Sequence, residues 1–198
     1  DLQLQAVELD PVVVDVAHEY FELPRDSRIK VDVDDGRQWL DDDDRRWDAI
    51  MIDAFYADAI PFHLFTAEFM ELVRSRLNPG GVVVTNTIGA ITGEQSRLFR
   101  SVYRTYRTAF PTVLVHPVKT PGDEGDSSVR NLMLIATEQA EPTKEFLNER
   151  CRIGERSKAA RDSLYSRSIS RRPSSASSAR RLARAESWPA VIAVIRKA

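Results

Sequence analysis

The sequence predicts an α/β protein built on a mostly parallel sheet. Short apolar runs typical of strands alternate with amphipathic runs typical of helices through residues 1–150, and this alternation indicates parallel strands joined by crossover helices. The run Trp47–Ile52 is apolar on both faces, as in a central parallel strand. The last two strand-like runs are joined by a polar loop without a helix, which predicts that the sheet ends in an antiparallel pair.

The first half of the chain carries clear local signals for its elements. Strands are expected at residues 3–9, 28–33 and 47–52, with helical runs at 12–21 and 37–40 between them. Pro11 suits the first turn of a helix, and Pro24 ends the helical pattern. Asp34, Asp35 and Gly36 form a turn after the second strand.

The elements that follow have similar signals. Thr66 suits the N-cap of a helix over residues 66–77, and the Asn-Pro-Gly-Gly run at 78–81 ends that helix. A β-branched strand is expected at 82–85 and a long helix at 94–110, which Pro111 ends. The last strands are expected at 112–118 and 131–137, and a further helix opens at 142–150.

The composition divides the chain at about residue 150. Residues 1–150 carry 16 Lys and Arg against 27 Asp and Glu, whereas residues 151–198 carry 12 against 3. Residues 157–187 hold 10 Ser among many Arg and keep no helical or strand period. We therefore expect an α/β core over 1–150 and a basic Ser/Arg-rich tail over 151–198 that is disordered or is not native sequence, as a frameshifted reading of the gene would give. Nucleic-acid binding by this tail is disfavoured, because few aromatic residues are interleaved with the basic ones.

The remaining composition excludes several classes of protein. Cys151 is the only cysteine, so the chain has no internal disulfide and no multi-cysteine metal site, and a reducing cytoplasm is the expected location. The histidines His18, His63 and His116 show no metal-ligand spacing, so no metal is expected. The longest apolar run, near residues 190–195, is far shorter than the ~20 residues of a membrane helix.

Three acidic residues follow the ends of the first three expected strands. In open α/β sheets, ligands bind beyond the carboxyl ends of the strands. Glu8 is a candidate to bind a ribose diol, and Asp35 to bind an adenine amino group with Gly36 allowing close approach; the alternatives are an exposed acid before a helix and a plain turn. Asp53 follows a fully apolar strand and is the candidate catalytic residue, able to receive a proton from an attacking amine; a turn or capping role is its alternative.

The loop after Asp53 carries further candidates. Tyr56, Asp58 and His63 lie in this loop, where a substrate would be contacted. His18 and His116 are expected to be structural or surface residues. No nucleophile-elbow, Walker or kinase motif is present.

Five segments together resemble the spermidine synthase (polyamine aminopropyltransferase) family. They are Val7–Asp10, Val33–Leu40, Trp47–Asp53, Leu64–Phe69 and Leu77–Val82. The resemblance implies a Rossmann-like fold of the S-adenosylmethionine-dependent methyltransferase type, with decarboxylated S-adenosylmethionine or S-adenosylmethionine as cofactor. By position, it assigns Glu8 to the ribose, Asp35 to the adenine and Asp53 to the reacting amine.

The expected function is transfer of an aminopropyl group to a small-molecule amine, polyamine biosynthesis being the family's process. The alternatives are an S-adenosylmethionine-dependent methyltransferase and a non-catalytic remnant of the fold. The family often forms dimers, so a homodimer is an expected assembly. No membrane partner is expected.

Two departures from the family qualify this expectation. The family's second loop aspartate would stand where this sequence has Tyr56. The sequence also begins after the fold's first strand and lacks the Gly-rich loop that follows it. In the expected strand order 3-2-1-4-5-7-6, the missing strand is central, so two strand edges would lack partners. We therefore expect this chain on its own to bind the cofactor poorly or not at all.

Overall fold

The computed structural model describes residues 2–25, 29–54, 61–118, 125–140 and 190–197. The strands are β1 (Leu2–Glu8), β2 (Ile29–Val33), β3 (Trp47–Ala54), β4 (Leu77–Gly89), β5 (Thr112–Pro117), β6 (Arg130–Thr137) and β7 (Ala190–Lys197). The helices are α1 (Pro11–Tyr20), α2 (Gly36–Asp42), α3 (Ala67–Ser75) and α4 (Arg97–Ala109), with short 3₁₀ turns η1 (Phe62–Phe65) and η2 (Glu94–Ser96).

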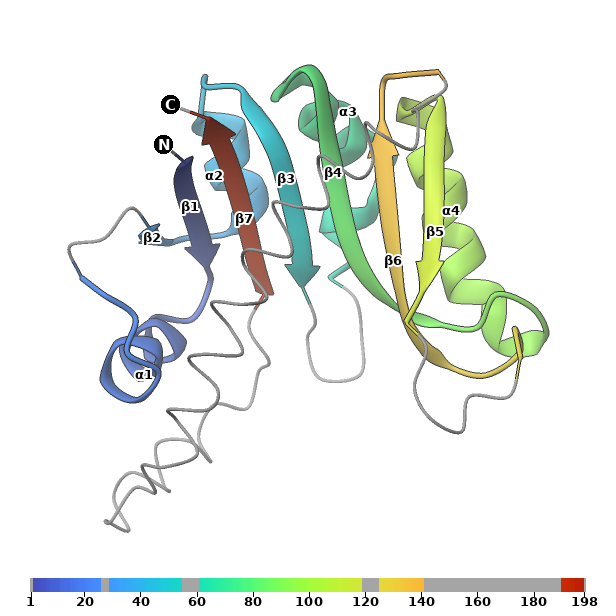
Figure 1. The fold of residues 1–198 in the computed structure, drawn as a ribbon, viewed down its shortest axis with the longest axis horizontal. Coiled ribbons are helices and arrows are strands. Elements are labelled where there is room, and N and C mark those ends of the chain that lie inside the picture. The colour runs from blue at the N-terminus through green and yellow to red at the C-terminus, as the bar shows by residue number, and fades with distance from the viewer. Residues whose placement is uncertain (1, 26–28, 55–60, 119–124, 141–189, 198) are drawn as a thin grey trace, which may run out of the picture.

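These strands form one seven-stranded sheet in the order β2-β1-β7-β3-β4-β6-β5 (Figure 1). β1 pairs with β2 in parallel, and β3 pairs with β4 in parallel. β6 runs antiparallel to both β4 and β5. The predicted α/β class and the antiparallel pair at the end of the sheet are therefore confirmed.

Local capping explains why the main helices begin where they do. The Asp10 side chain accepts a hydrogen bond from the N–H of Val12 at the start of α1, and Thr66 accepts one from the N–H of Phe69 at the start of α3. Among the bounds that differ from the prediction are those of α2 and β4. α2 continues through Asp42, and β4 begins at Leu77 because Leu77 pairs with Trp47 across an irregular register.

The largest difference between the expected and the observed sheet is the strand β7. It lies between β1 and β3 and runs antiparallel to both, with seven paired positions on β1 and six on β3. The expected pair of open strand edges is therefore wrong for this structure, because the chain's own C-terminal segment forms a backbone ladder with both. The expectation of an irregular tail over 151–198 does not hold for residues 190–197 either. The predicted division at residue 150 and the helix at 142–150 lie outside the described residues.

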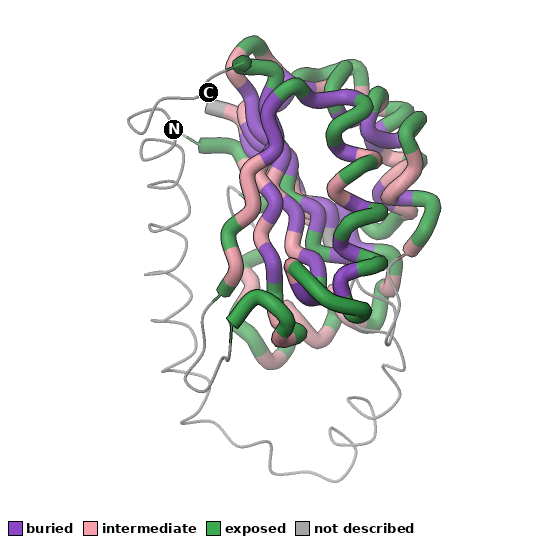
Figure 2. The backbone as a smooth tube through the Cα atoms, turned by 90° about the vertical axis from the view of Figure 1, so that its right-hand side faces the viewer, coloured by how far each residue is buried: buried purple, intermediate pink, exposed green. Residues whose placement is uncertain are grey.

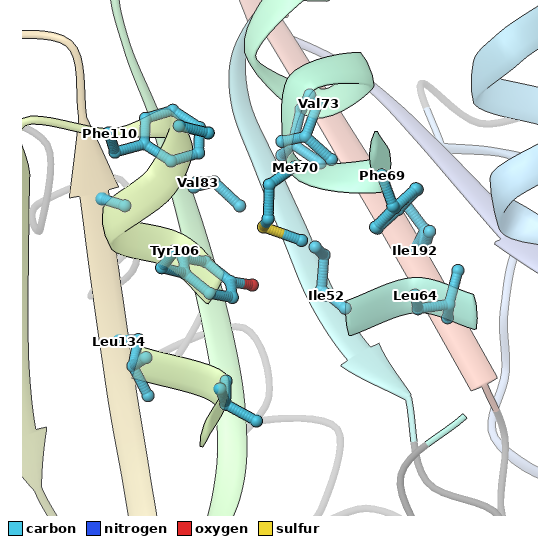
Figure 3. Close-up of a cluster of buried hydrophobic side chains, with 14 of the residues drawn as sticks. Ile52, Leu64, Phe69, Met70, Val73, Val83, Tyr106, Phe110, Leu134 and Ile192 are labelled. Atoms are coloured by element: carbon cyan, nitrogen blue, oxygen red, sulfur yellow. The ribbon is translucent and has the colours of Figure 1, made fainter. Parts of the chain in front are cut away.

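The main core lies between the sheet and three helices. Figure 2 shows buried backbone concentrated where the sheet faces these helices, which are α2, α3 and α4. Figure 3 shows Ile192 of β7 and Ile52 of β3 beside Phe69 and Met70 of α3, all within the same buried cluster. β7 thus contributes side chains as well as hydrogen bonds to the fold.

The opposite face of the sheet carries a much smaller cluster. Ala49, Val82 and Ile195 are buried there, and no residue of a described helix belongs to the cluster. α1 contacts β1 and β2 but buries none of its own residues. Within the described ranges, helices therefore cover one face of the sheet much more fully than the other. No helix in those ranges is long and apolar enough to cross a membrane.

A double-mutant cycle between Gly36 and Ile192 tests the position of β7. A Cβ built on Gly36 would lie 2.6 Å from Cδ1 of Ile192. We expect Gly36→Ala to lower the free energy of unfolding by about 1–3 kcal/mol through this overlap, although alanine is intrinsically the better helix former. Ile192→Ala should itself cost about 2–5 kcal/mol and should abolish the cost of Gly36→Ala. Urea unfolding of the four proteins measures the coupling, and strictly additive effects would contradict the placement of β7.

Candidate active site

Strand direction places the predicted acidic residues at one edge of the sheet. β1 and β2 are parallel, and β7 is antiparallel to both β1 and β3, so the first three strands all run the same way. Glu8 ends β1, Asp53 is the penultimate residue of β3, and Asp35 follows β2 by two residues. The backbone N–H of Asp34 donates to the carbonyl of Glu8, which joins the ends of β1 and β2.

Glu8 and Asp53 lie on either side of a single residue of β7. Both are paired in register with Val191, Glu8 from β1 and Asp53 from β3. Residues directly opposite one another in antiparallel pairs project to the same face. The two carboxylates therefore leave the same face of the sheet, two strand spacings or about 10 Å apart.

Glu8 is a buried carboxylate with one oxygen unused. Glu8 is only 4% exposed. Its Oε1 accepts a hydrogen bond of 2.9 Å from the N–H of Asp10. Oε2 is buried and has no hydrogen-bond partner among the described residues. Burial raises the pKa of the Glu8 carboxyl above its ordinary value, and the N–H of Asp10 opposes this effect. An incoming hydroxyl donor would satisfy Oε2.

Asp35 caps α2 and pairs with a histidine. Its Oδ1 accepts from the N–H groups of Arg37 and Gln38, at 2.9 and 3.0 Å. Its Oδ2 lies 3.0 Å from Nε2 of His63. The turn role weighed in the sequence is therefore present, as an N-cap, while Oδ2 is directed away from the helix backbone.

Gly36 makes its close approach to another part of the chain. The space over its Cα is filled by Ile192 of β7. In the structure the absence of a side chain at this position thus serves the packing of α2 on β7. Its predicted role beside a cofactor stays a prediction.

Asp53 is exposed and has one hydrogen-bond partner that the sequence did not reveal. Nδ2 of Asn86 donates to its Oδ1 at 3.1 Å. Asn86 lies on the neighbouring strand β4, and its own Oδ1 is buried with no hydrogen-bond partner in the part of the chain that the structure describes. The rule that singled out Asp53, a polar residue following an apolar strand, would also have found Asn86 after Val82–Thr85.

The other sequence candidates divide between described and undescribed parts of the chain. Tyr56 and Asp58 lie outside the described residues. His63 lies on η1, beside Asp35. His18 lies on α1, with Nδ1 2.7 Å from the carbonyl of Leu23, and His116 is exposed on β5. Within the ranges that the structure covers, no group of three or more His, Cys, Asp or Glu is arranged to hold a metal ion.

The fold and this edge together define a class of protein. A sheet whose first four strands run the same way, with acidic side chains at the carboxyl ends of several of them, is typical of Rossmann-like, nucleotide-using proteins. The chain has this fold, in the variant typical of S-adenosylmethionine-dependent methyltransferases and spermidine synthases.

Sequence comparison identifies the family within this class. The family model described as "Spermine/spermidine synthase domain" matches residues 3–133, and the chain belongs to this family. It is 44% identical over 85 residues to a probable polyamine aminopropyl transferase of Bifidobacterium longum, covering 43% of this chain and 19% of that protein. It is 29% identical over 133 residues to a polyamine aminopropyltransferase of Vibrio vulnificus, covering 66% of this chain and 42% of that protein.

Solved structures give the same result for the fold. A probable spermidine synthase from Corynebacterium glutamicum is similar with a TM-score of 0.58 at 27% identity, over 68% of this chain and 47% of that one. Human methyltransferase-like protein 13, solved with SAH, has a TM-score of 0.57 at 21% identity, over 86% and 72%. The chain spans less than half the length of the curated aminopropyltransferases that it matches.

The raised pKa of Glu8 gives a pH-dependent prediction. In the unfolded chain this carboxyl ionises at its ordinary pKa, whereas in the folded protein it ionises at a higher pH. Below the ordinary value it is protonated in both states, and as the pH rises through the folded pKa a buried charge appears and stability falls. Glu8→Gln should therefore gain stability relative to the unchanged protein as the pH rises from about 4.5, the ordinary value.

Urea unfolding at a series of pH values measures this gain. Glu68 provides the control, because it is exposed in the first turn of α3 and its own backbone N–H lowers its pKa. Glu68→Gln should lose relative stability as the pH rises toward 4.5, and it should show no further change in the region above 4.5 where Glu8→Gln gains. A gain for Glu8→Gln that is constant with pH, or that grows toward acid, would contradict the buried position of Glu8.

Proposed function

We propose that this chain carries the aminopropyl-transfer chemistry of its family, moving an aminopropyl group from decarboxylated S-adenosylmethionine to a small-molecule amine. The observation that supports it most is the pairing of Glu8 and Asp53 with the same residue of β7. This pairing leaves the candidate nucleoside-binding acid and the candidate base on one face of the sheet, with the single strand β7 between them. A cytoplasmic location and a homodimer belong to the same proposal.

The residues present fit the adenosine part of such a cofactor. Oε2 of Glu8 is a buried acceptor without a donor, and a ribose hydroxyl supplies a donor of the required kind. The backbone N–H groups at the start of α2 donate to Oδ1 of Asp35, so Oδ2 can accept a hydrogen bond from the amino group of an adenine. A related spermidine synthase was solved with the transition-state analogue AdoDATO, and methyltransferase-like protein 13 with SAH. An S-adenosyl compound as cofactor is consistent with both.

The proposed chemistry requires little more than positioning and one proton transfer. The sulfonium of the cofactor supplies an aminopropyl carbon that is already activated toward attack. The exposed carboxylate of Asp53 would accept the proton of the substrate ammonium, so that a neutral amine faces that carbon. Nδ2 of Asn86 holds one oxygen of this carboxylate and leaves the other to the amine. The predicted contacts of Tyr56 and Asp58 with the amine are part of this proposal.

Methyl transfer is the second candidate, because the same fold occurs in methyltransferases. The two reactions use different cofactors and add groups of different mass. Incubation of the chain with either cofactor and a panel of diamines, followed by mass spectrometry, separates them. Absence of product with both cofactors, at protein concentrations comparable with those of the substrates, would favour the non-catalytic remnant.

Replacement of Asp53 tests the catalytic assignment. Asp53→Asn removes the proton acceptor while keeping the size of the side chain, and we expect turnover to fall by about 10²–10⁴-fold. Cofactor affinity should stay within a few-fold, because Asp53 is assigned to the amine. Asp48→Asn, on the same strand, is the control and should leave turnover unchanged. An Asp53→Asn protein with unaltered turnover would refute the assignment.

The affinity of the chain for cofactor is a separate prediction. β7 occupies the place that the expected strand order gives to the strand before the family's Gly-rich loop. Because β7 runs antiparallel to β1 and β3, its carboxyl end lies at the opposite edge of the sheet from Glu8 and Asp53. We expect isothermal titration with S-adenosylmethionine or its decarboxylated form to show binding weaker than micromolar. A micromolar dissociation constant would show that other residues replace the loop.

A further inference from the structure

A cluster of hydrogen bonds joins η1 to the start of α2. Nη1 of Arg37 donates to the carbonyl of His63 at 2.8 Å and to Oγ1 of Thr66 at 3.3 Å. The guanidinium also lies over the ring of Phe69, 5.9 Å from its centroid. These contacts hold the backbone of His63 against α2, so its ring is presented to Asp35 from a fixed position.

The hydrogen bonds of Asp35 leave one acceptor site open. A carboxylate oxygen has two lone pairs. Oδ1 uses both, on the N–H groups of Arg37 and Gln38. Oδ2 has one short contact, to Nε2 of His63 at 3.0 Å. Because an ionised carboxylate only accepts hydrogen bonds, Nε2 must be the donor, and one lone pair of Oδ2 remains for a ligand.

Stability does not account for this pair. The side chains of His63 and Asp35 are 49% and 37% exposed, and exposed ion pairs contribute little to folding. The same exposure makes the open side of Oδ2 accessible to a small molecule. The geometry therefore suits recognition better than support of the fold.

We propose that His63 is a positioning residue for the adenine end of the cofactor, which deepens the proposed function and rests on it. His63 fixes the orientation of Oδ2 of Asp35 by donating from Nε2, so that the open lone pair meets an exocyclic amino group. A base with an oxo group at that position presents an acceptor instead and is rejected. The role differs from the predicted one, in which His63 lies with the loop that contacts the amine substrate.

Adenosine and inosine test this assignment, because they differ at the amino position of the base. Binding of each to the whole chain is followed by NMR titration, which reports dissociation constants in the millimolar range. The unchanged protein should prefer adenosine by roughly tenfold or more, as expected of a hydrogen bond to a charged group. His63→Leu should reduce this preference to less than about threefold, and His63→Gln, which keeps an N–H donor, should restore most of it.

The controls separate positioning from folding. His116→Leu changes an exposed histidine on β5 and should leave the preference unchanged, and the unfolding midpoint of His63→Leu should match that of the unchanged protein. A preference that persists in His63→Leu would overturn the role of His63 and leave the proposed function standing. An unchanged protein that shows no preference for adenosine, or binds neither nucleoside, would overturn the adenine assignment of Asp35 and the role of His63 with it.

Discussion

The insertion of β7 between β1 and β3 is the interaction on which the rest of the structure depends. Among the described strands, β1 pairs with β2 and β7 alone, so the ladder of β7 joins the β2-β1 pair to the other four strands. Ile192 and Val194 of β7 are fully buried in the main core. Removing this strand would leave two open edges and a gap in the apolar core at the same time. The spacing of Glu8 and Asp53 across the sheet is therefore set by the width of one strand that lies 137 or more positions away in the sequence.

Much of this architecture follows from local sequence signals, whereas β7 does not. The caps at Asp10 and Thr66 and the strand before Asp53 depend on residues close in sequence, and each was predictable. Residues 190–197 follow a long stretch without periodicity, and their pairing with β1 involves partners at the other end of the chain. β-propensity is decided largely by such neighbours. The early start of β4 has the same cause, since Leu77 is drawn into the sheet by Trp47 despite the Pro and Gly that follow it.

The candidate site was predictable to a similar extent. The position of an acid after a strand is a local property, so Glu8, Asp35 and Asp53 could be singled out. The oxygens that remain open to a ligand, by contrast, depend on residues distant in sequence. Asn86 hydrogen-bonds to Asp53 from the next strand, and His63 contacts Asp35 across 28 positions. The sequence could also not separate the two uses of Asp35, because one oxygen caps α2 while the other faces His63. Both uses are present in one side chain.

The carboxylates of Glu8, Asp35 and Asp53 differ in how many of their hydrogen bonds the protein itself supplies. This difference bears on what each would contribute to ligand binding. Asp35 is held by backbone and His63, and Asp53 is exposed to water with Asn86 beside it. Glu8 alone combines burial with an unused oxygen, a state that disfavours its ionised form. A ligand hydroxyl that donates to Oε2 would remove this penalty. Part of the binding free energy at the proposed ribose site would therefore come from satisfying an oxygen that lacks a hydrogen bond in the ligand-free protein. Contacts at Asp35 would then mainly decide which nucleobase binds, and contacts at Asp53 would involve the reacting amine.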